Sequence, residues 1–200
     1  MSVVTATVKD ELSQLPAGRG CCRRAELSAL LRFAGGLHLV AGRVVIEAEL
    51  DRGLAARRLR REIGELCGQP ARVRTLPAGG GHGSPRYLVW VERDGAMLAR
   101  CTGLIDRTGR PVRGLPPVVV SGGRCDAAAA WRGAFLANGS LSECRGSSAL
   151  QVAAPVQQCR DPVVVADYDP LDTAYPPGRG NNTQPAGGAD KRQRRIQPRG

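Results

Sequence analysis

Residues 21–50 read CCRRAELSALLRFAGGLHLVAGRVVIEAEL, and this stretch decides the fold. Apolar side chains recur in its first half at i, i+3, i+4 and i+7, which predicts a helix over 21–35. That stripe consists of Leu27, Leu30, Leu31 and Ala34. Gly35 and Gly36 predict that the helix ends in a left-handed turn. β-branched residues alternate in the second half, so strands are expected at 37–40 and 43–50.

The same pattern returns 104 residues further along the chain. The offset places Cys21 on Cys125, Ala25 on Ala129, Gly35 on Gly139 and Leu37 on Leu141. The stripe recurs as Trp131, Ala134, Phe135 and Asn138, and a glycine again ends the helix. We interpret this repeat as two α-β-β units. Small residues (Ala29, Ala34, Gly133 and Ala134) predict that the two helices pack closely together.

The other segments follow the same two periodicities. We expect helices at 4–15 (capped by Thr5 or Thr7), 52–67, 94–103 and 124–138. Strands are expected at 72–76, 86–91, 141–143 and 147–153. Residues 104–122 are expected to form an ordered crossing loop. Residues 52–67 are strongly amphipathic, with Ala55, Leu59, Ile63 and Leu66 on the apolar side. Their arginines (Arg57, Arg58, Arg60 and Arg61) are expected on the opposite, solvated side, where they can pair with Glu62 and Glu65.

The length of 200 residues suits one domain, or one domain plus a tail, and a hydrophobic content of 42% is enough for a core. Without a run of 18 apolar residues the sequence predicts no membrane helix, and its charged N-terminal segment favours a cytoplasmic protein. The 29 basic and 18 acidic residues give a net charge of +11, of which +9 precedes residue 156. Such a balance favours nucleic acid as a partner, although an arginine-rich composition also reflects a GC-rich genome.

The 7 cysteines follow no C-x-x-C spacing, and the two histidines, His38 and His82, are far apart in the sequence. We therefore expect neither a disulfide framework nor a structural zinc site, and we interpret most cysteines as small buried apolar residues. The glycine-rich segment 77–85 lacks the Gly-Lys-Ser/Thr ending of a phosphate-binding loop and is interpreted as a hairpin connection. No metal and no cofactor are predicted.

The strings CCRRAEL (21–27) and WRGAFLANGSL (131–141) resemble the WhiA family of bacterial sporulation regulators, in its actinobacterial form. The resemblance implies a duplicated α+β domain of the LAGLIDADG homing-endonuclease type, followed in the family by a helix-turn-helix domain. It also implies a DNA-binding, nucleoid-associated regulator of transcription, sporulation and cell division. The similar residues end near 155, so we interpret 156–200 as the tail of a truncated or frameshifted copy.

The expected domains are an N-terminal helix and linker (1–20), a first unit with its crossing loop (21–122), a partial second unit (123–155) and a largely disordered tail (156–200). Prolines 162 and 170 lie where the second unit would need a helix. Leu27, Leu30, Leu31, Gly35, Trp131, Gly133, Phe135 and Gly139 are assigned to the structural helix motif.

The resemblance aligns the metal-binding aspartates of homing endonucleases with Ala34 and Asn138, and these side chains predict that the domain is not an enzyme. Homing endonucleases hold DNA on a saddle-shaped sheet, which nominates the strand arginines Arg43, Arg72, Arg74 and Arg86. The helix arginines Arg57, Arg58 and Arg61 are further candidates for phosphate contacts. The alternatives are a domain that binds a protein partner and a non-functional fragment.

Overall fold

The computed structural model describes residues 2–16, 18–40, 42–78, 84–144 and 147–153. All of these residues belong to one compact unit. The expected tail at 156–200 lies outside the described residues. The domain boundaries proposed above therefore stay predictions.

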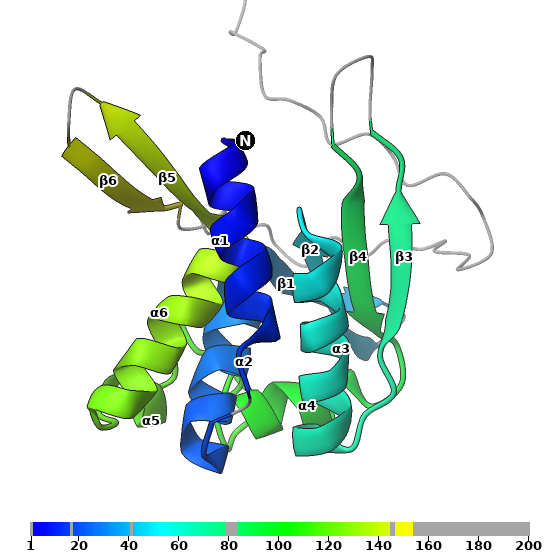
Figure 1. The fold of residues 1–200 in the computed structure, drawn as a ribbon. Helices are drawn as coiled ribbons and strands as arrows, with labels where there is room; N and C mark the ends of the chain where they lie inside the picture. The colour runs from blue at the N-terminus through cyan, green and yellow to red at the C-terminus, as the bar shows by residue number, and fades with distance from the viewer. Residues whose placement is uncertain (1, 17, 41, 79–83, 145–146, 154–200) are drawn as a thin grey trace, which may run out of the picture. The chain divides into compact units, whose positions relative to one another are not determined.

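The described part combines helices with consecutive pairs of strands (Figure 1). Its elements are α1 (Val3–Gln14), α2 (Gly20–Ala34), β1 (Gly35–Val40), β2 (Arg43–Leu50), α3 (Gly53–Cys67), β3 (Arg72–Leu76), β4 (Arg86–Val91), α4 (Gly95–Thr102), α5 (Pro117–Val120), α6 (Arg124–Asn138), β5 (Gly139–Cys144) and β6 (Ser147–Val152). These bounds confirm the predicted elements, and the crossing loop proves to contain the short helix α5. None of the helices in the described ranges has the length and apolar character needed to span a membrane.

Four strands form an antiparallel sheet in the order β1-β2-β4-β3, while β5 and β6 form a separate antiparallel pair. One face of the four-stranded sheet packs on helices. Ile46, Ala48, Val89 and Val91 of that face belong to one buried cluster with leucines of α2, α3 and α4 (Leu27, Leu30, Leu59 and Leu98). The mixed α/β class with antiparallel pairing is thus confirmed.

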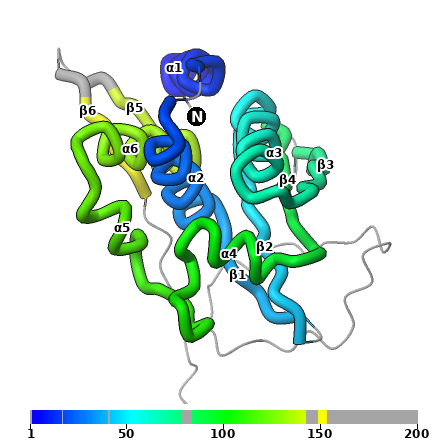
Figure 2. The backbone as a smooth tube through the Cα atoms, turned by 90° about the horizontal axis from the view of Figure 1, so that it is seen from below, coloured from blue at the N-terminus to red at the C-terminus, as the bar shows by residue number. Residues whose placement is uncertain are grey.

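Helices α2 and α6 lie side by side, as Figures 1 and 2 both show, and each passes directly into a strand. Their backbones approach so closely that a Cβ atom built on Gly133 would lie 2.3 Å from the backbone oxygen of Glu26. Ala29 and Ala134 are buried in the same contact. The predicted close packing through small residues and the duplicated α-β-β order are confirmed.

Gly35 corrects the expected helix ending. Its φ of −155° and ψ of −159° are extended, so α2 does not end in a left-handed turn. A Cβ atom at Gly35 would lie 1.7 Å from the backbone oxygen of Glu47. The glycine is therefore needed because β2 passes close to it, and Gly139 at the end of α6 is extended too.

Three further expectations are wrong in detail. Trp131 is 64% exposed, although its position in the repeat placed it on the buried stripe. Thr5 does not cap α1: its buried hydroxyl donates to the Leu141 carbonyl (3.2 Å) and accepts from the Leu141 amide (2.9 Å), which joins α1 to β5. Cys67 and Cys101 form a disulfide, because the C-terminal halves of α3 and α4 meet.

Candidate nucleic-acid interface

The strand arginines share the face of the sheet directed away from the apolar core, called here the outer face. Directly opposed residues of neighbouring strands point to the same face, and successive residues alternate. Arg74 is opposite Leu88, and Leu88 is opposite Glu49, whereas Ala48 and Val89 point into the core. The same alternation puts Arg43, Arg72 and Arg86 on the outer face with Arg74.

Carboxylates neutralise part of this positive charge. The Arg86 Nε atom lies 3.0 Å from a Glu49 oxygen, and Arg72 Nη1 lies 3.9 Å from a Glu92 oxygen. Arg43 and Arg74 are exposed and have no ion-pair partner within the part of the chain that the structure describes. These two side chains therefore carry the positive charge of the outer face that is most available to a polyanion.

Trp90 lies at the centre of the outer face, between Glu47 on one neighbouring strand and Arg72 on the other. It is only half buried. An aromatic ring next to an arginine adds a surface on which a planar base or a sugar can pack. Trp90 was not among the residues predicted from the sequence. The alternation of RYLVWV (86–91) nevertheless places Trp90 on the same face as Arg86.

The helix arginines form a different set. Arg57 is exposed and lines a cavity of about 270 Å³ together with Asp10, Asp51 and Tyr87. Arg61 is half exposed and pairs with Glu62 (3.7 Å) and Glu65 (4.0 Å), as the solvated alternative predicted. Because α3 packs on the core face of the sheet, the fold does not bring these arginines together with those of the outer face.

Arg58 is a correction, since it is 3% exposed and not solvated. Its Nε atom donates to Glu26 Oε1 (2.5 Å), and its Nη1 atom donates to the carbonyl oxygens of Ser13 (3.2 Å) and Leu15 (2.5 Å). A side chain held in this way cannot reach a phosphate on the surface. Arg58 is thus part of the interior that joins α1, α2 and α3.

The C-terminal ends of α2 and α6 carry Ala34 and Asn138, the two positions that the resemblance aligned with endonuclease aspartates. The Asn138 amide nitrogen donates to the Phe33 carbonyl at the end of α2. An ionised aspartate has no proton for this bond, whereas asparagine satisfies a carbonyl that the helix end leaves without an intrahelical partner. The side chain at 138 therefore has a structural contact that depends on its amide.

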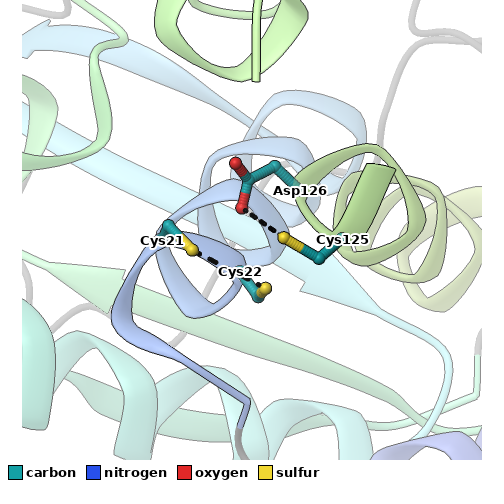
Figure 3. Close-up of side chains that lie close together, drawn as sticks. All are labelled: Cys21, Cys22, Cys125 and Asp126. Atoms are coloured by element: carbon teal, nitrogen blue, oxygen red, sulfur yellow. Dashed lines mark hydrogen bonds between the residues drawn. The ribbon is translucent and has the colours of Figure 1, made fainter. Parts of the chain in front are cut away.

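At the opposite ends of the same two helices, three thiols and a carboxylate meet (Figure 3). Cys21 and Cys22 belong to the first turn of α2, and Cys125 and Asp126 to the first turn of α6. Burial and the two neighbouring thiols raise the pKa of Cys22 to about 12, and hydrogen bonding, first with Cys21, lowers the pKa of Asp126. The sequence held one signal of this cluster: the 104-residue offset superimposes 21 on 125 and 22 on 126.

Residues 20–105 match the model of the family described as the WhiA N-terminal LAGLIDADG-like domain. The chain is 65% identical over 152 residues to the probable cell division protein WhiA of Parafrankia sp. (strain EAN1pec), covering 76% of this chain and 47% of the relative. It is 60% identical over 152 residues to the protein of the same name from Streptomyces coelicolor, covering 76% and 46%. The chain thus spans about half the length of the curated relatives it matches.

One solved structure, described as the crystal structure of the N-terminal LAGLIDADG domain of DUF199/WhiA, is similar at 19% identity with a TM-score of 0.47. The similarity covers 71% of this chain and 61% of that one.

Proposed function

We propose that this chain, in which residues 20–105 are a WhiA N-terminal LAGLIDADG-like domain, is a DNA-associated, non-catalytic regulator of the WhiA type. The curated relatives are named probable cell division proteins. The proposal therefore places the chain among regulators of cell division and sporulation, acting at the nucleoid. Its direct partner is duplex DNA.

The observation that carries the proposal is the common outer face of Arg43, Arg72, Arg74 and Arg86, which come from three strands. Arginines spread across a sheet can contact phosphates on both sides of a groove. Such contacts supply affinity that is independent of base sequence and falls as salt concentration rises. The outer face therefore suits positioning on a duplex better than reading of its bases.

The non-catalytic part of the proposal is supported by the side chains at 34 and 138. Metal-assisted cleavage of a phosphodiester needs acidic oxygens to hold Mg²⁺ and to activate water. Ala34 offers no ligand atom, and the Asn138 amide group already donates to the Phe33 carbonyl. Incubation of the chain with plasmid and Mg²⁺ should leave the plasmid intact, and cleavage that the purified protein sustains would contradict this part.

DNA binding can be tested by fluorescence anisotropy of a random-sequence duplex at a series of salt concentrations. The variant Arg43→Ala/Arg74→Ala removes two outer-face charges that have no ion-pair partner among the described residues. Arg57→Ala/Arg60→Ala is the matched control, because it removes two exposed arginines from α3. Each lost phosphate contact should reduce the magnitude of the negative slope of log K against log salt by about 0.9, so the slope of the first variant should be about 1.8 less steep.

The control variant should retain the slope of the parent chain. Equal losses in both variants would mean that net charge alone drives the binding, and an absence of binding at low salt would refute the DNA proposal. A stronger loss in the control would transfer the interface to α3.

A protein-binding role is the second candidate, and exposed apolar side chains favour it. Val118 of α5 is 63% exposed, Val120 is 71% exposed, and Trp131 of α6 is 64% exposed. Tryptophan is enriched at the centres of protein interfaces. A chain that fails to bind DNA at low salt but self-associates or binds a partner in a Trp131-dependent manner would support this second function.

A further inference from the structure

We propose that Cys21, Cys22, Cys125 and Asp126 form a binding site for one Zn²⁺ ion, which links the N-terminal ends of α2 and α6. The site lies at the other end of these helices from Ala34 and Asn138. It does not depend on the proposed DNA binding, and its test uses the metal alone.

Two distances within the cluster match the edges of a tetrahedral zinc site, and the others are at most about 1 Å longer than such an edge. One ligand atom from each of the four residues lies within 4.8 Å of all the others. The Sγ atoms of Cys21 and Cys22 are 3.8 Å apart, and Cys125 Sγ is 3.7 Å from Asp126 Oδ1. Zn–S bonds of about 2.3 Å at tetrahedral angles place two sulfurs about 3.8 Å apart, and a sulfur and an oxygen about 3.6 Å apart. Small side-chain rotations are therefore enough to close the site.

The donor set selects the metal. Three sulfurs and one carboxylate oxygen suit a borderline-soft cation, whereas Mg²⁺ and Ca²⁺ require oxygen ligands. Four protein ligands fill the tetrahedral shell, as they do in structural zinc sites, and leave no position for a catalytic water. Cys21 and Cys125 are exposed, so the ion can enter from solvent, while Cys22 is buried in the helix contact.

The position at two helix N-termini favours the charge of such a complex. Three thiolates, one carboxylate and one Zn²⁺ together carry a charge of −2. The four side chains belong to the first turns of α2 and α6, where the positive ends of the two helix dipoles lie.

The packing around the cluster explains what the ion would add. This end of the helix contact is lined by Ala25, Ala29, Ala129 and Ala130. An alanine methyl group buries little apolar surface compared with leucine, so these contacts stabilise the helix pair weakly. Zinc ligands from both helices would join them directly, and the free energy of metal binding would add to the stability of the fold.

The experiment uses the full 200-residue chain, purified with a phosphine reductant and freed of metal by a chelator. CoCl₂ is added first, because thiolate-to-cobalt charge-transfer absorption reports sulfur ligands and intense visible bands report tetrahedral geometry. ZnCl₂ then displaces cobalt, and a chromogenic chelator measures one zinc ion per chain. Thermal unfolding is followed with and without zinc.

The variants Cys21→Ser and Cys125→Ser change exposed side chains, so both are expected to fold. Loss of an outer-shell partner alone costs about 10- to 100-fold in metal affinity, and loss of a ligand should cost at least about 100-fold. Asp126→Asn should weaken binding while retaining the sulfur-to-cobalt absorption. Two controls, Cys67→Ser/Cys101→Ser and Cys159→Ser, should bind cobalt and zinc like the parent chain.

Unaltered cobalt spectra in Cys125→Ser would overturn the proposal, as would zinc binding without any rise in the unfolding temperature. A disulfide between Cys125 and Cys21 or Cys22, identified by peptide mass in the unreduced protein, together with no cobalt binding after reduction, would also overturn it. That result would assign the cluster to thiol oxidation instead of metal binding.

Discussion

Glu26 should be among the most sensitive positions to a change of a single atom, because its carboxylate is 3% exposed and holds two arginines. Oε1 accepts from Arg58 Nε at 2.5 Å, while Oε2 accepts from Arg58 Nη2 at 3.2 Å and from Arg132 Nε at 2.8 Å. Through Arg58 the network extends to the carbonyls of Ser13 and Leu15 at the end of α1. The side chains of one glutamate and two arginines therefore connect α1, α2, α3 and α6.

The perturbation is Glu26→Gln, which keeps the shape of the side chain but removes its charge. Arg58 is as buried as Glu26 and cannot reach water. The Arg132 side chain is 21% exposed, so its charge can still be solvated. Removing one partner of a buried ion pair leaves an uncompensated charge and costs about 3–5 kcal/mol. At about 2–4 °C per kcal/mol for a domain of this size, the unfolding temperature should fall by roughly 10 °C.

The assay is urea unfolding followed by circular dichroism, with thermal unfolding as a second measurement. Glu65→Gln is the matched control, because Glu65 also pairs with arginines (Arg23 and Arg61) but is 50% exposed, and exposed pairs contribute about 0–1 kcal/mol. The apolar double variant Glu26→Leu/Arg58→Met should recover much of the loss, since it removes both buried charges. A loss below about 1 kcal/mol for Glu26→Gln, or a double variant less stable than either single change, would refute this reasoning.

Three further changes test the packing, the covalent link and a turn. Gly133→Ala should destabilise the chain by about 1–3 kcal/mol, because the new Cβ atom would meet the Glu26 backbone. Its control, Gly64→Ala on the exposed side of α3, should stabilise the chain by up to about 1 kcal/mol. Equal effects of the two changes in urea unfolding would contradict the close helix contact. Cys67→Ser/Cys101→Ser opens a loop with a sequence separation of 34, and loop entropy predicts a loss of about 3.8 kcal/mol, which unfolding in the presence and absence of reductant measures. Hydrogen bonds, first from Thr108 and then from the Arg110 amide, lower the pKa of Asp106. The ionised Asp106 side chain therefore contributes to folding stability above its unfolded-state pKa of about 3.9, and this stability is lost as pH falls through the lower folded-state pKa. Asp106→Asn should therefore show a weaker acid dependence of stability than the parent chain, and identical acid profiles would argue against this turn.

Periodicity in the sequence predicted the helices and strands because that information is local. The apolar stripe of residues 27–34 and the alternation of 43–50 each need only their own segment to be recognised. The predicted solvation of Arg58 was wrong for a related reason. Arg58 and Glu62 flank the stripe of α3 at three and seven residues after Ala55, and α1 from elsewhere in the chain packs over that flank. Helical periodicity shows a polar flank but not the helix that covers it.

The candidate sites likewise combine features that the sequence predicted with features that depend on tertiary packing. The resemblance to homing endonucleases nominated the strand arginines, and the strand register places them on one face of the sheet. The resemblance could not show that Glu49 and Glu92 neutralise two of them, because those ion pairs depend on how separate strands lie next to one another. The Cys67–Cys101 disulfide was missed because a separation of 34 residues becomes a contact only when α3 and α4 meet.

By itself the sequence determined the order of the elements, the duplication of the α-β-β unit, and the need for small residues where the paired helices approach. These properties follow from side-chain size and from the periods of helix and strand, which are encoded in neighbouring residues. The tertiary structure alone decided which charges are buried, which arginines keep their charge available, and that three thiols and a carboxylate from residues 21–22 and 125–126 converge. Each of these depends on distances between segments far apart in the chain, and those distances arise only when the helices and the sheet pack together.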